Sequence, residues 1–391
     1  MKAILQPLEL RGGRLWDGIA DTSREGSVFT AISDVGVTLA GTASPESRIL
    51  DVSGCTIIPG LIEAHAHLCF NAHTDWREVY DSETYETLLL RMAGSANQML
   101  VSGITTVRDL GAPTKLAVAL REAIRARLVS GPNLLVAGAP ITPTGGHCWF
   151  LGGETDGLEG VQLAVRERKK AGVDWIKVMA TGGNMTPGTN VFAAQYSVEE
   201  LRAIVAEAHR LELKVTAHAH GIEGIKSVVD ANVDMIEHCS FQTPDGPVKD
   251  DEVILAIARS GIAVSPTING AFAKERNEAR WHMRKTLMKS FFDARCDVLM
   301  STDCGIPDTP HENLAQALIV ISDLAELSPV ETMKLATSLS AKLLDLPDRG
   351  TIEPGQRADL LIVEGDPTQD LKSLQHVRIV ILNGELVSEV K

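Results

Sequence analysis

The sequence predicts an α/β fold: a (β/α)8 TIM barrel with a small β-sandwich formed from both chain termini. Three observations predict it. Short apolar runs alternate with helical patterns through the middle of the chain, polar residues follow the ends of these runs, and both ends of the chain show short strands punctuated by Gly and Pro. We therefore expect a composite β-sandwich domain, residues 1–56 plus 345–391, and a barrel domain, residues 57–344.

Composition narrows the class of protein. Of 391 residues, 44% are hydrophobic and 23% are charged, which is ordinary for a soluble globular chain. The net charge of −14 argues against nucleic acid and against an anionic membrane as partners, and no apolar run approaches the roughly 20 residues of a membrane span. We expect a homo-oligomer that acts on a small-molecule substrate. Six cysteines without a CxxC pair, and an N-terminus without a secretion signal, predict a cytoplasmic location.

The terminal module is predicted from alternation and turn residues. A turn at Gly12-Gly13 should separate two short strands, and a Gly- and Pro-rich connector at 350–356 should lead back from the barrel. The expected strands are residues 8–10, 14–16, 35–39, 48–52, 359–363 and 377–383.

The barrel is predicted from eight apolar runs, each followed by a helical pattern. A Ser197-x-x-Glu200 capping box marks the start of one helix. A doubly wound sheet alternates in the same way, but eight units with polar strand ends favour the barrel. The expected strands are residues 56–61, 104–108, 134–138, 175–180, 215–218, 235–238, 262–266 and 298–301. The expected helices are residues 83–100, 115–128, 160–171, 197–211, 221–230, 251–260, 276–294 and 313–324, with a last one near 328–344.

The run Ile58-Pro59-Gly60-Leu61-Ile62-Glu63-Ala64-His65-Ala66-His67 ends the first barrel strand with two histidines. Residues two apart on a strand point to the same face, so both imidazoles face one way. Alone, such a pair is a weak indication of a metal site.

Other strand ends supply partners for this pair. Polar groups of suitable type follow the fourth, fifth, sixth and eighth strands, and barrel active sites form at this face. Nitrogen and oxygen ligands of this kind suit Zn²⁺ and similar divalent ions. The candidates are Lys177, His218, His220, His238 and Asp303.

The motifs together resemble the amidohydrolase superfamily, and most closely its metal-dependent dipeptidase and carboxypeptidase (prolidase-like) branch, near imidazolonepropionase. The resemblance covers essentially the whole chain. It is carried by Pro59-Gly60-Leu61-Ile62-Glu63-Ala64-His65-Ala66-His67, Ser102-Gly103-Ile104-Thr105-Thr106-Val107-Arg108-Asp109, Ile176-Lys177-Val178-Met179-Ala180-Thr181-Gly182-Gly183, Ala217-His218-Ala219-His220-Gly221, Ile236-Glu237-His238, Ser301-Thr302-Asp303 and Gly350-Thr351-Ile352-Glu353-Pro354-Gly355-Gln356-Arg357-Ala358-Asp359-Leu360.

The resemblance implies a site with two divalent metal ions, and the ligand types predict zinc. His65 and His67 would bind the more buried ion, and His218 and His238 the second. Asp303 would bind the first ion and act as general base and acid. A lysine ammonium repels metals, so the resemblance further implies that CO2 carboxylates Lys177, giving an anion that can bridge both ions.

The implied reaction is attack of metal-bound hydroxide on the amide carbonyl of a small dipeptide or N-acyl amino acid. His147 follows Gly145-Gly146 in a loop, and relatives use such a histidine to bind the substrate carboxylate. His220, where relatives often have Tyr, is a catalytic or substrate contact, or else a packed structural histidine.

The sequence leaves other functions open. The same chemistry could hydrolyse a cyclic amide, a lactone or an organophosphate, as in imidazolonepropionase-like enzymes. Deamination is disfavoured, because Gly221 stands where deaminases of the superfamily place a Glu. A barrel without activity is disfavoured by the intact ligand set. A basic segment, residues 274–285, would indicate an anionic substrate if it faces the site, and Trp149 could stack on a ring-bearing one.

Overall fold

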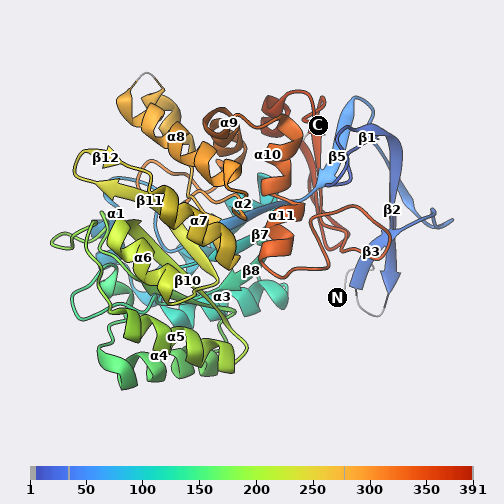
Figure 1. Ribbon diagram of the computed structural model, residues 1–391. Coiled ribbons are helices and arrows are strands. Elements are labelled where there is room, and N and C mark those ends of the chain that lie inside the picture. Colours follow the sequence, from blue (N-terminus) through green and yellow to red (C-terminus); the bar gives the residue numbers. More distant parts are fainter. Residues whose placement is uncertain (1–5, 34–35, 277, 390–391) are drawn as a thin grey trace.

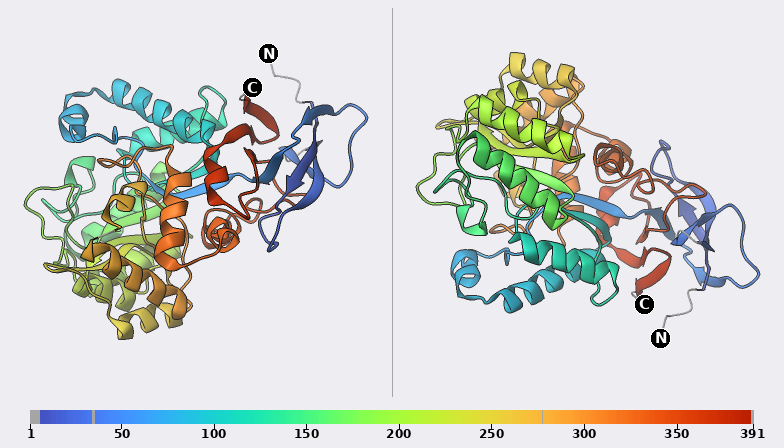
Figure 2. Two further views of the ribbon diagram at one scale, coloured as in Figure 1. Left: turned by 90° about the horizontal axis from the view of Figure 1, so that it is seen from above. Right: turned by 90° about the horizontal axis from the view of Figure 1, so that it is seen from below.

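The computed structural model describes residues 6–33, 36–276 and 278–389. It has a mixed α/β fold in two parts (Figure 1). Helices surround short strands in the larger part, and a β-sheet built from both ends of the chain lies beside it. The two further views in Figure 2 show the same side-by-side arrangement.

Both chain ends contribute to one sheet, which we call the terminal sheet. Its order is β16-β15-β14-β5-β1-β2-β3, and β4 pairs with β1. The two ends join where β14 runs antiparallel to β5, with Ile362 opposite Ile57. Its strands are β1 (Leu8–Leu15), β2 (Arg24–Ser33), β3 (Gly36–Ala40), β4 (Arg48–Asp51), β5 (Cys55–Pro59), β14 (Leu360–Glu364), β15 (Val377–Leu382) and β16 (Glu385–Glu389). The chain ends therefore meet as predicted, but as one sheet; a two-layer sandwich stays a prediction, as do the domain boundaries.

The predicted turn at Gly12-Gly13 is a bulge within a single strand. The register of β1 against β2 shifts between Leu10 and Gly13, while the strand continues to Leu15. Gly12 has φ of 88°, a conformation that a bulge can require and that suits glycine. The glycine pair predicted a turn between two short strands, because glycine pairs occur in turns and in bulges alike.

The first predicted barrel strand is divided at Gly60. β5 ends at Pro59 in the terminal sheet, and β6 (Leu61–Ala66) begins the larger part. A Cβ atom on Gly60 would lie 2.1 Å from Oγ1 of Thr105, so the chain can pass so close to that residue only with glycine. The strand that carries His65 is thus anchored in the terminal sheet through its predecessor.

Strands of the larger part form two sheets, in which all pairs are parallel except β11 with β12. One sheet has the order β6-β7-β8, and the other β12-β11-β10-β9 with β13 beside β11. The added strands are β7 (Ile104–Asp109), β8 (Asn133–Val136), β9 (Trp175–Met179), β10 (Lys214–Gly221), β11 (Met235–Thr243), β12 (Gly246–Pro247) and β13 (Ala263–Ser265). Parallel pairing of consecutive strands aligns their carboxyl ends on one side, where the candidate site residues lie.

The two sheets do not close into one continuous ladder. Single parallel bridges join them in the order that a barrel would require: Ile141 to Val178, Val264 to Val298, and Ala66 to Cys304. The predicted eighth strand at 298–301 has no continuous ladder and contributes only the bridge at Val298. A closed eight-stranded barrel is therefore not seen as such.

Helices cover the outside of these sheets, and their buried faces are aliphatic. The capping box predicted at Ser197 is present at the start of α5, with Glu200 as its partner. The last predicted helix is two, because the chain turns at Ala336 and Thr337. The helices are α1 (Trp76–Ser82), α2 (Tyr85–Val101), α3 (Thr114–Arg125), α4 (Gly157–Ala171), α5 (Val198–Arg210), α6 (Ile222–Asp230), α7 (Asp251–Ser260), α8 (Ala279–Asp293), α9 (Leu314–Ala325), α10 (Pro329–Leu335) and α11 (Ser338–Leu343), with 3-10 turns η1 (Trp149–Leu151), η2 (Gly270–Glu275) and η3 (Leu371–Gln375). Across the described ranges, no helix has the length and apolar character to cross a membrane.

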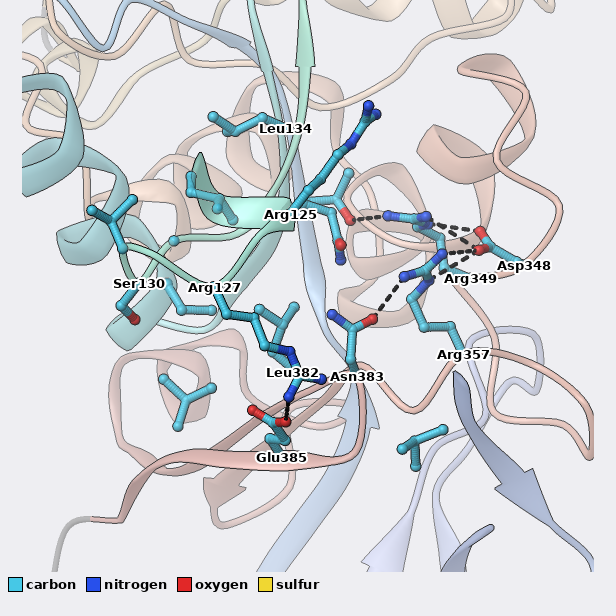
Figure 3. A pocket seen from close by; sticks show the side chains of 18 of the residues that line it. Arg125, Arg127, Ser130, Leu134, Asp348, Arg349, Arg357, Leu382, Asn383 and Glu385 are labelled. Atoms are coloured by element: carbon cyan, nitrogen blue, oxygen red, sulfur yellow. Dashed lines mark hydrogen bonds and ion pairs between the residues drawn. The ribbon is translucent and has the colours of Figure 1, made fainter. Parts of the chain in front are cut away.

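A cleft of about 860 Å³ lies between the terminal sheet and the larger part. Figure 3 shows Arg349 and Arg357 paired with Asp348, and Arg127 paired with Glu385, at the seam where the two parts meet; Arg125 points away from them. Arg357 donates to Asp348 at 2.6 Å and to Asn383 at 2.7 Å, and Arg349 donates to Thr106 of β7 at 3.0 Å. Asp348 accepts from both arginines, so this carboxylate ties the connector to both parts of the chain.

Candidate active site

His65, His67 and Asp303 converge at the carboxyl end of β6. Nε2 of His65 lies 3.2 Å from Nε2 of His67, and Oδ1 of Asp303 lies 3.2 Å and 3.1 Å from these two atoms. The backbone N–H of Asp303 donates to the carbonyl of His65 at 3.0 Å, which fixes the two segments together. Oδ1 of Asp303 is buried and has no hydrogen-bond partner of acceptable geometry in the described ranges of the chain. Three converging atoms with lone pairs and no proton donor between them fit a cation.

A second histidine group lies beside the first. Nδ1 of His218 is 2.8 Å from Nε2 of His238, and one ligand atom each from His218, His220 and His238 lie within 4.8 Å of one another. A further possible ligand group comprises His65, His238 and Asp303. Since His238 lies close to members of both groups, the two form one continuous cluster. The structure thus brings together residues that β6, β10, β11 and the segment after Val298 contribute.

Lys177 points into this cluster from β9 and is 2% exposed. Its Nζ atom has no hydrogen-bond partner within the part of the chain that the structure describes. Burial lowers the pKa of Lys177 to about 8, against the opposing effect of Glu237 and Asp303. A buried ammonium without a partner is costly, whereas a less basic amine is more often neutral and able to react with CO2. These properties fit a carboxylated lysine.

Burial would lower the pKa of His67, but Asp303 outweighs burial and raises it. Burial keeps the four other histidines of the cluster neutral. It lowers the pKa of His65 and of His220 to about 4 each, and the pKa of His218 and of His238 well below its ordinary value. Neutral imidazole is the form that binds metal. The donor set, rich in nitrogen with one carboxylate, fits a divalent transition ion such as zinc.

The backbone is strained where it presents these groups. His238 and Asp303 have φ of 66° and 62°, in the left-handed region that residues with side chains seldom adopt. Cys239 and Thr267 share this conformation nearby. Such strain concentrates at functional sites, where the surrounding fold stabilises it. The pairing of β10 with β11 is also irregular directly after His238.

His147 reaches the cluster from the loop after β8. Its ring centroid lies 4.6 Å from that of His218, and its backbone N–H donates to Gln195 at 2.8 Å. Gln195 in turn donates to the carbonyl of Met179 at the end of β9. Burial lowers the pKa of His147 to about 3, and its Nδ1 atom lacks a partner among the described residues. The loop histidine is therefore held neutral beside the candidate ligands.

His220 contacts a serine and a histidine of the neighbouring strand β11. Nδ1 lies 2.8 Å from Oγ of Ser240, and its ring stacks on that of His238 with centroids 4.4 Å apart. It is only partly buried, so one edge of the ring remains accessible. These contacts are compatible with a structural role and with contact to a substrate.

Buried carboxylates brace the loops around the cluster. Glu63 accepts from the N–H groups of His65 and Thr302, and burial raises its pKa to about 7 despite these bonds. Asp109 accepts from the N–H groups of Leu68 and Gly111.

Two supporting residues received no role from sequence reasoning. His311 is buried and its Nε2 atom lies 3.1 Å from the carbonyl of His67. Glu237 belongs to the motif Ile236-Glu237-His238 but was assigned no role from it. Its Oε2 atom lies 2.8 Å from Nδ1 of His65, and its Oε1 atom lies 2.8 Å from Nη2 of Arg108. Burial would raise the pKa of Glu237, but Arg108 and His65 hold it well below its usual range. Its position before His238 was the signal that could have indicated it.

Three basic residues of segment 274–285 form ion pairs, two of them at the surface. Arg276 pairs with Asp323, and Lys285 with Glu326. Arg284 differs, because its side chain is only 17% exposed and lies over the ring of Phe272 while pairing with Glu275 at 3.1 Å. Trp149 is 40% exposed in η1, directly after the loop that carries His147.

Comparison with known proteins identifies the family. The model of the amidohydrolase family matches residues 56–387. The chain belongs to the amidohydrolase family. It is accordingly a hydrolase of carbon–nitrogen bonds, and the amidohydrolase resemblance expected from its motifs is confirmed.

Several amidohydrolases are similar along most of this chain. Ochratoxinase of Aspergillus niger is 28% identical over 362 residues, 83% of this chain and 73% of that protein. Imidazolonepropionase of Deinococcus radiodurans is 24% identical over 384 residues, 89% of this chain and 86% of that protein. A solved Xaa-Pro dipeptidase with bound methionine in the active site is 26% identical, with a TM-score of 0.86 over 98% of this chain and 100% of that one.

Proposed function

We propose that this amidohydrolase holds two divalent metal ions and hydrolyses the amide bond of a small dipeptide or N-acyl amino acid. The observation that carries the proposal is Lys177, a buried amine that has no hydrogen-bond partner among the described residues and whose charge acts on the pKa of both His65 and His238. The similar dipeptidase structure with an amino acid in its active site supports the substrate class.

We assign the first ion to His65, His67 and Asp303, and the second to His218 and His238. A carboxylated Lys177 would bridge them, with zinc as the favoured metal because of the nitrogen-rich donor set. The convergence of Nε2 of His65, Nε2 of His67 and Oδ1 of Asp303 supports the first assignment.

Divalent ions held there would supply Lewis-acid activation of water and of the amide carbonyl. Asp303 takes the proton of the attacking water at Oδ2, the carboxylate oxygen that is not assigned to the ion, and later gives it to the leaving nitrogen. The pKa of Asp303 is lowered: burial would raise it, but His65 and His67 outweigh burial and keep the carboxylate ionised to accept that proton. Its strained backbone and its N–H bond to His65 hold it in place for both transfers.

The substrate's free carboxylate would be bound by His147, with His220 as a second contact near the scissile bond. Both lie beside His218 in the cluster. Arg284 is the basic residue best shielded from solvent in its segment and would add positive potential for an anionic substrate.

The test is a kinetic panel on the metal-reconstituted protein. Dipeptides and N-acyl amino acids with a free carboxylate should be hydrolysed, while the corresponding C-terminal amides should have a raised KM. Metal analysis should give two ions per chain. Turnover of none of these amides would overturn the substrate class, and one ion per chain would overturn the binuclear site.

A second candidate is hydrolysis of a cyclic amide, lactone or organophosphate. The similarity to imidazolonepropionase along most of the chain favours including such substrates in the panel. Deamination is the least favoured reaction, because Gly221 supplies no carboxylate.

We further propose a cytoplasmic homo-oligomer. All six cysteines are free and buried, which suits a reducing compartment. Cell fractionation and light scattering of the purified chain would test the location and the oligomeric state.

A further inference from the structure

Glu237 is the centre of a buried network beside the candidate metal site. The side chain has no exposed surface, and neither does that of Arg108. Oε2 lies 2.8 Å from Nδ1 of His65, and Oε1 accepts from Nη2 of Arg108 at 2.8 Å. The hydroxyl groups of Thr216 and Ser265 also donate to this carboxylate. Every neighbour of Glu237 in this set can donate a proton.

This arrangement determines which nitrogen of His65 carries the proton. Arg108 is a permanent cation, so the carboxylate that it pairs with is an anion and can only accept. Nδ1 of His65 must therefore be the protonated nitrogen, and Nε2 keeps its lone pair. Nε2 is the atom that faces His67 and Asp303.

The same network extends to the second group of histidines. Ser265 lies 2.9 Å from Ser301, whose hydroxyl accepts from the N–H of Thr267 at 2.9 Å. The hydroxyl of Thr267 lies 2.8 Å from Nδ1 of His238. Glu237 is thus connected to His238 both by sequence adjacency and by hydrogen bonds.

We propose that Glu237 is a positioning residue that fixes the orientation and tautomer of His65, and that Arg108 fixes the orientation of Glu237. The inference rests on the proposed function, since it assigns His65 to a metal. A carboxylate that accepts from the free ring N–H of a metal-ligating histidine orients the ring and makes it a more basic ligand. Loss of such a carboxylate typically reduces metal affinity by roughly 10–100-fold.

The decisive variant is Glu237→Gln, which keeps size and removes the charge. If the amide oxygen faces Arg108, its NH2 group faces Nδ1 of His65 and forces the proton onto Nε2. If the amide turns, its NH2 group meets the guanidinium and leaves Arg108 unpaired. We expect a zinc affinity about 10–100-fold below that of the unsubstituted chain, measured by chelator competition.

The double variant Glu237→Gln with Arg108→Met separates positioning from general damage. Without the guanidinium, the amide oxygen is free to accept from His65, and the hydroxyls of Thr216 and Ser265 can reverse to accept from its NH2 group. Zinc affinity should recover by at least about threefold over the single variant. The control Asp359→Asn also neutralises a buried carboxyl, distant in the terminal sheet, and should leave zinc affinity unchanged.

Histidine ¹⁵N NMR of the metal-free full chain gives a readout that needs no metal and leaves Glu237 unchanged. His65, assigned by its loss in His65→Gln, should be the Nδ1–H tautomer. The Nε2–H tautomer would overturn the proposal, as would full zinc affinity in Glu237→Gln or no recovery in the double variant. If the unsubstituted chain binds no zinc, the proposed function fails, while the tautomer still decides the role of Glu237.

Discussion

Gly183 packs directly against the ring of His147. A Cβ atom at Gly183 would lie 2.4 Å from Nε2 of His147 and 2.5 Å from Cε1. The space for the loop histidine therefore depends on a residue that has no side chain, in the glycine pair that follows β9.

Gly183→Ala should displace His147 and weaken substrate binding. Overpacking of this kind costs about 1–3 kcal/mol where neighbours cannot yield. We expect KM for a carboxylate-bearing substrate to rise by about 10-fold, which corresponds to about 1.4 kcal/mol, with a smaller change in kcat. Steady-state kinetics on acids and their amides would measure it. Gly94→Ala in α2, where a Cβ meets nothing within 4 Å, is the matched control; equal KM values in both variants would contradict the prediction.

Lys177→Ala should abolish the bridging ligand. Since loss of even an outer partner reduces metal affinity or activity 10–100-fold, we expect activity to fall by at least about 100-fold. Metal analysis should show fewer ions per chain. Added acetate or propionate should restore part of both, because a small carboxylate can occupy the space of the lost carbamate. Unchanged metal content would show that Lys177 is not a ligand.

Asp359 should make stability depend on pH in an unusual direction. Burial raises the pKa of its carboxyl to about 6, despite a bond from Asn383 and the charges of Arg349 and Arg357. A carboxyl with a raised pKa binds its proton more tightly when folded. Its contribution is therefore largest below pH 4 and is lost as pH rises through about 6, by about 3 kcal/mol.

Asp359→Asn should remove this dependence. We expect the free energy of unfolding of the variant, measured by urea titration, to fall less than that of the unsubstituted chain between pH 4.5 and 7. Parallel pH profiles for the two proteins would contradict the assigned pKa.

Asp348→Asn should loosen the seam shown in Figure 3. Asp348 accepts from Arg349 and Arg357, which reach β7 and the terminal sheet, respectively. Its side chain is 42% exposed, so solvent screening limits the expected loss of stability to about 1 kcal/mol. Asp345→Asn, which removes a single exposed pair with Lys214, should cost less. Thermal unfolding would measure both losses of stability. A larger loss for Asp345→Asn than for Asp348→Asn would contradict the proposed role of Asp348 in joining the two parts of the chain.

Local sequence patterns predicted most elements of the fold, because amphipathic periodicity and caps act over a few residues. The capping box at Ser197 and the paired chain ends are examples. Local patterns did not predict strand boundaries that depend on contacts between residues distant in the sequence. Gly12 makes a bulge because β2 continues alongside it, and the strand divides at Gly60 because Thr105 lies against it. Neither neighbour is close in sequence.

The sequence by itself determined the family and the set of residues that meet at the site, because those motifs are local. Only the tertiary structure decided how they meet. It placed Nζ of Lys177 among the histidines, without a hydrogen-bond partner in the part of the chain that the structure describes. It also gave His238 and Asp303 left-handed backbones and placed Glu237 against His65. The physical reason is that burial, strain and hydrogen-bond direction depend on neighbours brought together from distant strands, which no spacing along the chain records.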